Sequence, residues 1–227
     1  MPEPKNPDTI IIKNKMYPKG LTESQVWKYY QDYKGIILNN TRGRDLMFAI
    51  MVELNKPIMK RRGVGLDVIQ LNNNNYDTII TGRTVTIYPT MRAYTDFCVV
   101  DIDTNDWKKA KHITQLIYHQ LKKSNFIIDI KILYTGKNAF HLHCKFRNKL
   151  PILRAKSIIE EYLRRNQNHT LYTMQHKRLV NKPNIDLSPN KFKGAYIVEG
   201  SLSIWGLKCM QVKINELRNF KQWKAKI

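Results

Sequence analysis

The feature that most constrains the fold is a regular succession of strand-like and helix-like segments from residue 97 onward. Runs of alternating apolar and polar residues predict strands, and runs with apolar residues at helical spacing predict helices. Turn residues and Pro151 separate these runs. The expected elements are a strand at 97–103, a helix from residue 104 or 106 to 121, strands at 126–134 and 140–146, a helix at 151–163 and a last strand at 193–200.

The order strand-helix-strand-strand-helix-strand predicts an α+β fold with an RRM-like (ferredoxin-like βαββαβ) core. In that topology the first and third strands are neighbours, and the fourth strand flanks the first. We expect a single domain over residues 1–227, with an N-terminal α/β subregion at 1–95, the core at 96–207 and a basic C-terminal helix at 208–227.

The N-terminal subregion carries fewer signals. Thr22 followed by Gln25 forms a capping-box pattern, which predicts that a helix begins there. Residues 83–88 alternate like a strand, whereas residues 41–75 contain stretches that fit either a helix or a strand. The asparagine-rich stretch at 71–77 predicts a loop.

The charge balance points to a polyanionic partner. The chain has 39 Lys and Arg residues against 18 Asp and Glu residues, which gives a net charge of +21. Each phosphate that a basic protein neutralises releases counterions, so this excess favours nucleic-acid binding. A basic proteome or a need for solubility would produce the same balance. No run of about 18 apolar residues and no secretory signal is present, so we expect no membrane attachment and a cytoplasmic, DNA-associated protein.

The cysteines argue against structural zinc. Cys98, Cys144 and Cys209 are far apart and lie among apolar residues. An odd number of cysteines without a CxxC pair predicts buried thiols in a reducing compartment and no zinc site.

Acidic residues are expected to gather on one face of the predicted sheet. Side chains alternate between the faces of a strand, so Asp101 and Asp103 point one way, and Val100 and Ile102 point into the core. Asp186 lies just before the expected fourth strand, on the other flank of the first. Mg²⁺ and Mn²⁺ prefer carboxylate ligands, and two such ions about 3.5–4 Å apart promote phosphoryl transfer. An Asp-x-Asp pair by itself can also be no more than a helix cap.

Two histidines share the corresponding face of the third strand. His141 and His143 follow a turn, Thr135 to Asn138, that offers backbone N–H groups, a hydroxyl and an ammonium group to an anion. His141 can donate a hydrogen bond to the same phosphate. His143 either does the same or is a structural residue. A zinc site would need a third ligand that this stretch does not supply.

Three motifs in this order resemble the signature of the archaeo-eukaryotic primase superfamily. This superfamily includes catalytic primase subunits, primase-polymerases of mobile elements and the polymerase domain of bacterial ligase D. VVDID resembles its metal motif, YTGKNAFHLH its nucleotide motif, and NIDLSP with the later YIVEGSLSIWGL its third acid and the strand that follows. Upstream, MYPKGLTESQVWKYY looks like the entry helix of ligase D-type domains.

The sequence departs from the family pattern in three places. Thr135 replaces the usual serine and keeps its hydroxyl. Ala139 stands where a glycine is common, so the turn must there adopt a conformation that a Cβ allows. The basic residue often found before the Gly-Ser-Leu triplet is missing, and its charge would have to come from Lys191, Lys193 or Lys208.

The resemblance implies a template-directed nucleotidyltransferase, a DNA primase or primase-polymerase that uses NTPs or dNTPs and two Mg²⁺ or Mn²⁺ ions. It implies catalytic, metal-binding roles for Asp101, Asp103 and Asp186. The residues that it implies for nucleotide binding are Thr135, Gly136, Lys137, His141 and Ser201.

Single-stranded or primer-template DNA is the expected macromolecular partner. The candidates for backbone contact are Lys60, Arg61, Arg62, Arg83 and Arg92. Three aromatic residues of the first helix could stack on bases, but their helical spacing favours core packing. These residues are Trp27, Tyr29 and Tyr30.

Other functions stay open at this point. A primer-dependent, end-joining type of repair polymerase would use the same residues, and so in part would a metal-dependent nuclease. A non-catalytic RRM-like nucleic-acid-binding protein would expose aromatic residues on its sheet instead of carboxylates. The compact chain fits an archaeal, viral or plasmid-borne primase that works with a large primase subunit, a helicase or a ligase.

Overall fold

The computed structural model describes residues 9–11, 21–53, 56–60, 70–165, 172–175, 178–181, 185–203 and 205–227. The chain forms two compact units. The first unit contains Met1–Thr90, Ala195–Cys209 and Ala225–Ile227, and the second contains Met91–Gly194 and Met210–Lys224. Residues 195–207 therefore belong to the first unit, although the sequence placed them with the core.

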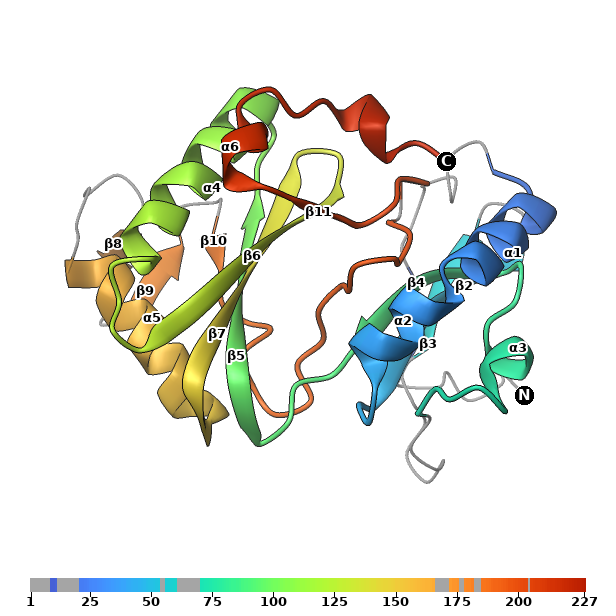
Figure 1. Ribbon diagram of the computed structural model, residues 1–227, viewed down its shortest axis with the longest axis horizontal. Coiled ribbons are helices and arrows are strands. Elements are labelled where there is room, and N and C mark those ends of the chain that lie inside the picture. The colour runs from blue at the N-terminus through green and yellow to red at the C-terminus, as the bar shows by residue number, and fades with distance from the viewer. Residues whose placement is uncertain are drawn as a thin grey trace, which may run out of the picture. The chain divides into compact units, whose positions relative to one another are not determined.

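The second unit is built on an antiparallel five-stranded sheet in the order β10-β5-β7-β6-β11, against which α4 and α5 pack (Figure 1). β5 lies between β7 and β10, so the predicted pairing of the first strand with the third is confirmed, whereas the strand on its other side is not the one that the sequence predicts. The elements of this unit are β5 Tyr94–Asp103, α4 Trp107–Leu121, β6 Ile127–Gly136, β7 Ala139–Pro151, α5 Ile152–Arg165, β8 Tyr172–Gln175, β9 Arg178–Asn181, β10 Ile185–Asp186, β11 Met210–Val212, α6 Ile214–Leu217 and the 3-10 helix η1 Gln222–Ala225, whose last residue belongs to the first unit.

The predicted last strand at 193–200 is wrong. The strand that flanks β5 is β10, which is only two residues long, and Ala195 forms an isolated bridge with Thr90 of the first unit. A tight turn explains the difference. Lys193 has φ of 60°, and a Cβ on Gly194 would lie 2.1 Å from the carbonyl oxygen of Pro189. The chain therefore turns where an extended strand was expected.

The predicted C-terminal helix at 208–227 is also wrong. Met210–Val212 forms β11 and pairs with β6, and two short helical turns follow. β11 covers the edge of β6 at Ile132–Tyr134, which would otherwise be unpaired. Phe220 is buried and packs with Trp107, Tyr134 and Phe140, so individual apolar residues of the tail are drawn into the core.

The first unit contains a four-stranded sheet in the order β1-β3-β2-β4. The predicted capping box is confirmed, because the Thr22 side chain accepts from the Gln25 N–H and the Gln25 side chain accepts from the Thr22 N–H. Residues 46–53, which fitted either a helix or a strand, form a strand. The elements of this unit are β1 Thr9–Ile11, α1 Glu23–Asp32, α2 Lys34–Thr41, β2 Leu46–Glu53, β3 Lys56–Lys60, α3 Tyr76–Ile79 and β4 Thr84–Pro89.

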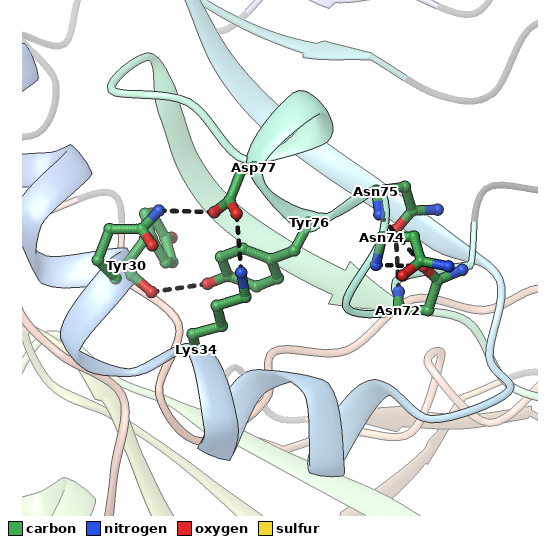
Figure 2. A network of polar contacts seen from close by, with 8 residues as sticks. Tyr30, Lys34, Asn72, Asn74, Asn75, Tyr76 and Asp77 are labelled. Carbon is green, nitrogen blue, oxygen red and sulfur yellow. Dashed lines mark hydrogen bonds and ion pairs between the residues drawn. The ribbon is translucent and has the colours of Figure 1, made fainter.

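Buried tyrosines organise the core of the first unit. The Tyr76 hydroxyl donates to the Tyr30 carbonyl oxygen at 2.7 Å, and beside it Asp77 accepts from Lys34 at 2.8 Å (Figure 2). The expected loop at 71–77 is a hydrogen-bonded asparagine turn that leads into α3, so its last two residues are helical. Tyr29 and Tyr30 are buried, which confirms that they pack in the core, whereas Trp27 is 36% exposed, so the prediction of core packing is wrong for it.

The three cysteines were predicted to be buried thiols, and this prediction is confirmed. All three cysteines are buried and unpaired. Burial raises the pKa of Cys98 to about 12, so its thiol is protonated at neutral pH. Within the described part of the chain, no helix is long and apolar enough to cross a membrane.

Candidate active site

β5 has the two faces that its alternation predicts. Val100 and Ile102 are fully buried on the helix-covered side. Asp101 is half-buried, with 28% of its side chain exposed, and Asp103 at the strand end is exposed. The strand therefore directs both carboxylates away from the core.

Strand register brings three candidate residues into one row across the sheet. Asp186 of β10 lies opposite Asp101 of β5, and Asp101 lies opposite His141 of β7. Residues that face each other on neighbouring strands have their Cβ atoms about 4.5–5.5 Å apart. We call Asp186, Asp101 and His141 the acidic row. Its members come from chain positions far apart, and only the antiparallel topology joins them.

Asp101 and His141 are in contact. The His141 Nε2 atom lies 3.3 Å from Asp101 Oδ1, and only 6% of the His141 side chain is exposed. Its other nitrogen, Nδ1, is buried and has no hydrogen-bond partner among the described residues. A buried polar atom without a partner costs about 1–3 kcal/mol. This cost favours a role for His141 in binding a ligand.

His143 lies in a different environment from His141. Its ring stacks on Phe97 at 5.8 Å and on His141 at 6.0 Å between ring centroids. His143 pairs in register with Val99, which is fully buried. These contacts support the structural interpretation of His143.

Asp186 is oriented by Ser188. Asp186 Oδ1 accepts a hydrogen bond from the Ser188 N–H at 2.7 Å, and Oδ2 accepts from the Ser188 hydroxyl at 2.6 Å. Both oxygens of the carboxylate are thus fixed within its own turn. The Asp-x-Ser spacing is a signal in the sequence that could have identified Ser188.

Asn190 extends the hydrogen bonding of β5 beyond the end of β10. Its side-chain oxygen accepts from the Val99 N–H at 2.7 Å, and its Nδ2 donates to the Val99 carbonyl oxygen at 2.5 Å. Asn190 is fully buried, and its Nδ2 also donates to the Leu187 carbonyl oxygen at 3.2 Å. The Asn190 amide therefore replaces the backbone hydrogen bonds that a neighbouring strand would make to Val99, and it fixes the turn after Asp186 to β5. The sequence analysis missed it.

The turn between β6 and β7 carries the predicted anion-binding residues. Thr135 and Gly136 are buried and Lys137 is exposed, with φ of 118° at Gly136 and 46° at Lys137. Ala139 has no positive φ, which explains why it can replace a glycine. Asp103 lies opposite Ala139, so the end of the turn adjoins the second carboxylate of β5.

Gln222 holds the tip of this turn. Its side-chain amide donates to the Lys137 carbonyl oxygen and to Asn138 Oδ1, the latter at 3.0 Å. The Tyr134 hydroxyl also donates to the Lys137 carbonyl oxygen, at 3.1 Å. No pattern in the sequence pointed to Gln222, because it lies 85 residues away from Lys137.

The donor types of the acidic row suit a hard cation, but the side chains do not converge as placed. Among the described residues, no group of three or more His, Cys, Asp or Glu side chains is arranged to hold a metal ion. Asp186 instead binds Ser188, and Asp101 contacts His141. Carboxylate oxygens from two paired strands fit the chemistry of Mg²⁺ or Mn²⁺, so a metal role stays a prediction.

The remaining candidates lie outside the acidic row. The Ser201 hydroxyl is buried in the first unit, where it accepts from the Ile87 N–H at 2.8 Å. Arg83 pairs with Glu23 at 3.1 Å, and Arg92 is exposed. Lys60 is the last residue of β3, and Arg61 and Arg62 lie outside the described residues. Their predicted roles stay predictions.

The fold is similar to that of a solved structure, although no match to the sequence was found among protein families or curated proteins. Among solved structures, the chain is similar to the polymerase domain of Mycobacterium tuberculosis ligase D in complex with DNA. The TM-score is 0.72 at 14% identity, over 91% of this chain and 87% of that one. The protein therefore has the mixed α+β fold of that polymerase domain.

Proposed function

We propose that the protein is a template-directed nucleotidyltransferase, a DNA primase or primase-polymerase with an RRM-like core. The observation that carries the proposal is the acidic row, in which Asp101 lies opposite Asp186 and contacts the buried His141. The likeness of the fold to a DNA-bound polymerase domain supports it. The net charge of +21 suits a nucleic-acid substrate.

The reaction joins a 3′-hydroxyl to the α-phosphorus of a nucleoside triphosphate. A P–O bond forms to the hydroxyl oxygen, the bond to the bridging oxygen breaks, and pyrophosphate leaves while the hydroxyl proton passes to solvent. Catalysis of this kind is mostly positioning and charge stabilisation. Thr135, Gly136 and Lys137 would bind the triphosphate through the turn, and His141 would donate a hydrogen bond to a phosphate oxygen.

The carboxylates have a separate role in this proposal. Asp101, Asp103 and Asp186 would hold two Mg²⁺ or Mn²⁺ ions, which would neutralise phosphate charge and favour ionisation of the attacking hydroxyl. Each carboxylate oxygen has more than one acceptor site, so Asp186 would hold the cation while Oδ2 still accepts from the Ser188 hydroxyl. Ser188 thereby becomes a residue that sets the direction of the carboxylate.

A primer-dependent repair polymerase is the second candidate. The likeness of the fold to a ligase D polymerase domain favours it, because that protein is a polymerase domain bound to DNA. Both candidates share the same residues and reaction. They differ in whether the first bond joins two free nucleotides or extends an existing strand.

Nucleotide incorporation on a single-stranded template tests the proposal. The reaction is run with and without an annealed primer, with NTPs or dNTPs, in Mg²⁺ and in Mn²⁺. We expect products that depend on template and divalent metal. Products without primer identify a primase, and products only with primer identify a repair polymerase. Strand binding without incorporation under every condition would contradict both and leave a non-catalytic nucleic-acid-binding protein.

A further inference from the structure

An exposed aromatic residue lies between two lysines shortly after Asp186 in the sequence. Lys191, Phe192 and Lys193 form a turn directly after Asn190, and all three side chains are exposed. Phe192 is 60% exposed, which is high for a large apolar side chain. We call residues 191–193 the Lys-Phe-Lys turn.

The backbone of the Lys-Phe-Lys turn is held on both sides. The Lys193 N–H donates to the Met91 carbonyl oxygen at 3.0 Å, and the Met91 N–H donates to the Gly194 carbonyl oxygen at 2.7 Å. Within the turn, the Gly194 N–H donates to the Lys191 carbonyl oxygen at 2.8 Å. Phe192 is therefore presented to solvent from a fixed backbone. A contact residue that is ordered in advance loses less entropy when it binds.

Lys193 adopts an unfavourable backbone conformation for a lysine. Its φ of 60° lies in the left-handed region, where glycine has the lower cost. Among the described residues, Lys137 of the predicted anion-binding turn is the other non-glycine residue with positive φ. The Lys193 Nζ atom lies 5.4 Å from the centroid of the Phe192 ring. Such backbone conformations concentrate at functional sites.

We propose that the Lys-Phe-Lys turn binds single-stranded nucleic acid. Phe192 stacks on an unpaired base, and Lys191 and Lys193 bind the phosphates on either side of it. Aromatic side chains that alternate with cations are how proteins hold single strands, because every base offers a π-face and every linkage a charge. Two flanking lysines suit a polyanion and disfavour an apolar protein surface.

The turn is connected to the acidic row through Asn190. That side chain fixes the same segment to Val99, which lies two positions before Asp101 in β5. If the proposed function holds, the bound strand is the template or the primer. The identity of the strand as template or primer rests on the proposed function, but strand binding can be measured without any synthesis.

Phe192→Ala tests the stacking role, and Phe126→Ala is its matched control. Phe126 is 54% exposed in the same unit, but its sequence neighbours are Asn125 and Ile127. Affinity for a fluorescent single-stranded oligonucleotide is measured without metal or nucleotide. Loss of one stacked base predicts a Kd about tenfold higher for Phe192→Ala, little change for Phe126→Ala and retention of affinity by Phe192→Trp. Equal Kd values for the two alanine variants would overturn the proposal.

Lys193→Gly separates a functional lysine from a structural one. Glycine relieves the left-handed backbone, so thermal stability should be unchanged or slightly higher while strand affinity falls. A purely structural turn would show no loss of affinity, which contradicts the proposal. For the pair Lys191→Gln and Lys193→Gln, the slope of log K against log salt should fall by about 0.7 for each phosphate contact. The pair Lys122→Gln and Lys123→Gln, exposed at the end of α4, is the control.

Nucleotide kinetics provide the last discriminating result. If Phe192→Ala raises the KM for the nucleoside triphosphate and leaves strand affinity unchanged, the turn serves the nucleotide and the proposal is wrong. If the wild-type protein synthesises nothing, the proposed function fails. The affinities of Phe192→Ala and Phe126→Ala still decide whether the turn binds a strand.

Discussion

Asp101 and Asp186 lie opposite each other but are held in different ways. Asp101 sits in a ten-residue strand that pairs on both sides, so the backbone ladder fixes the direction of its side chain. Asp186 sits in a two-residue strand and depends on the side chains of Ser188 and Asn190. The orientation of a side chain in a long strand should therefore survive substitutions of nearby residues. In a two-residue strand, a substitution of Ser188 or Asn190 should change the orientation of the Asp186 carboxylate.

Asp101→Asn is the change with the largest expected effect on activity. It keeps the size of the side chain but removes the charge that faces His141 and the proposed cations. We expect kcat for nucleotide incorporation to fall by at least about 10³-fold, while strand affinity and Tm stay near wild type. Steady-state synthesis and oligonucleotide binding measure both quantities. A parallel loss of binding and activity would show that Asp101 has a structural role instead.

The arrangement around Asp101 could be predicted because it follows from local periodicity. Alternation in β5 and β7 assigned Asp101, Asp103, His141 and His143 to one face, and the order of elements made the two strands neighbours. Register then determined which residues meet. The side chains that share a face could be predicted because the period of two fixes side-chain direction along a regular strand.

Asn190→Ala is expected to have the largest effect on stability. It removes both hydrogen bonds to the Val99 backbone, and each buried group left without a partner costs about 1–3 kcal/mol. Chemical denaturation should show a lower free energy of unfolding, with Asn125→Ala as an exposed control. Alkylation of the buried Cys98 should become faster as the edge of β5 opens. Unchanged stability and alkylation would show that β5 is fixed without Asn190.

The surroundings of Asp186 could not be predicted in the same way. A two-residue strand is too short to give a periodic signal. The fourth strand was therefore predicted at the more apolar stretch 193–200. Asn190 and Gln222 donate to backbone carbonyl oxygens of distant segments, which leaves no local pattern in the sequence. Ser188 is the exception, because an Asp followed two residues later by Ser is a known turn signal.

Ser188→Ala should affect activity more than stability. The backbone N–H still binds Asp186 Oδ1, but Oδ2 loses its donor and the carboxylate can rotate. We expect about a tenfold loss in kcat/KM and a changed dependence on metal concentration, with Tm within a few degrees of wild type. Ser188→Thr, which keeps a hydroxyl, should restore most of the activity. Failure of that rescue would contradict a positioning role for the hydroxyl.

Ser201→Ala tests a second serine, one that the resemblance assigns to nucleotide binding. The Ser201 hydroxyl accepts from the buried Ile87 N–H inside the first unit. We expect a loss of about 1 kcal/mol in the free energy of unfolding and little change in the KM for nucleotide. A raised KM at unchanged stability would instead support the nucleotide-binding role that the resemblance implies.

The most direct measurement is the anomalous diffraction of Mn²⁺ in crystals with a non-hydrolysable nucleoside triphosphate and a single-stranded template. We predict Mn²⁺ peaks at the carboxylates of Asp101, Asp103 and Asp186, with the triphosphate against His141 and the turn at Thr135–Lys137. Binding of the metal or the triphosphate at another surface, with the acidic row unchanged, would contradict its assignment as the centre of nucleotidyl transfer.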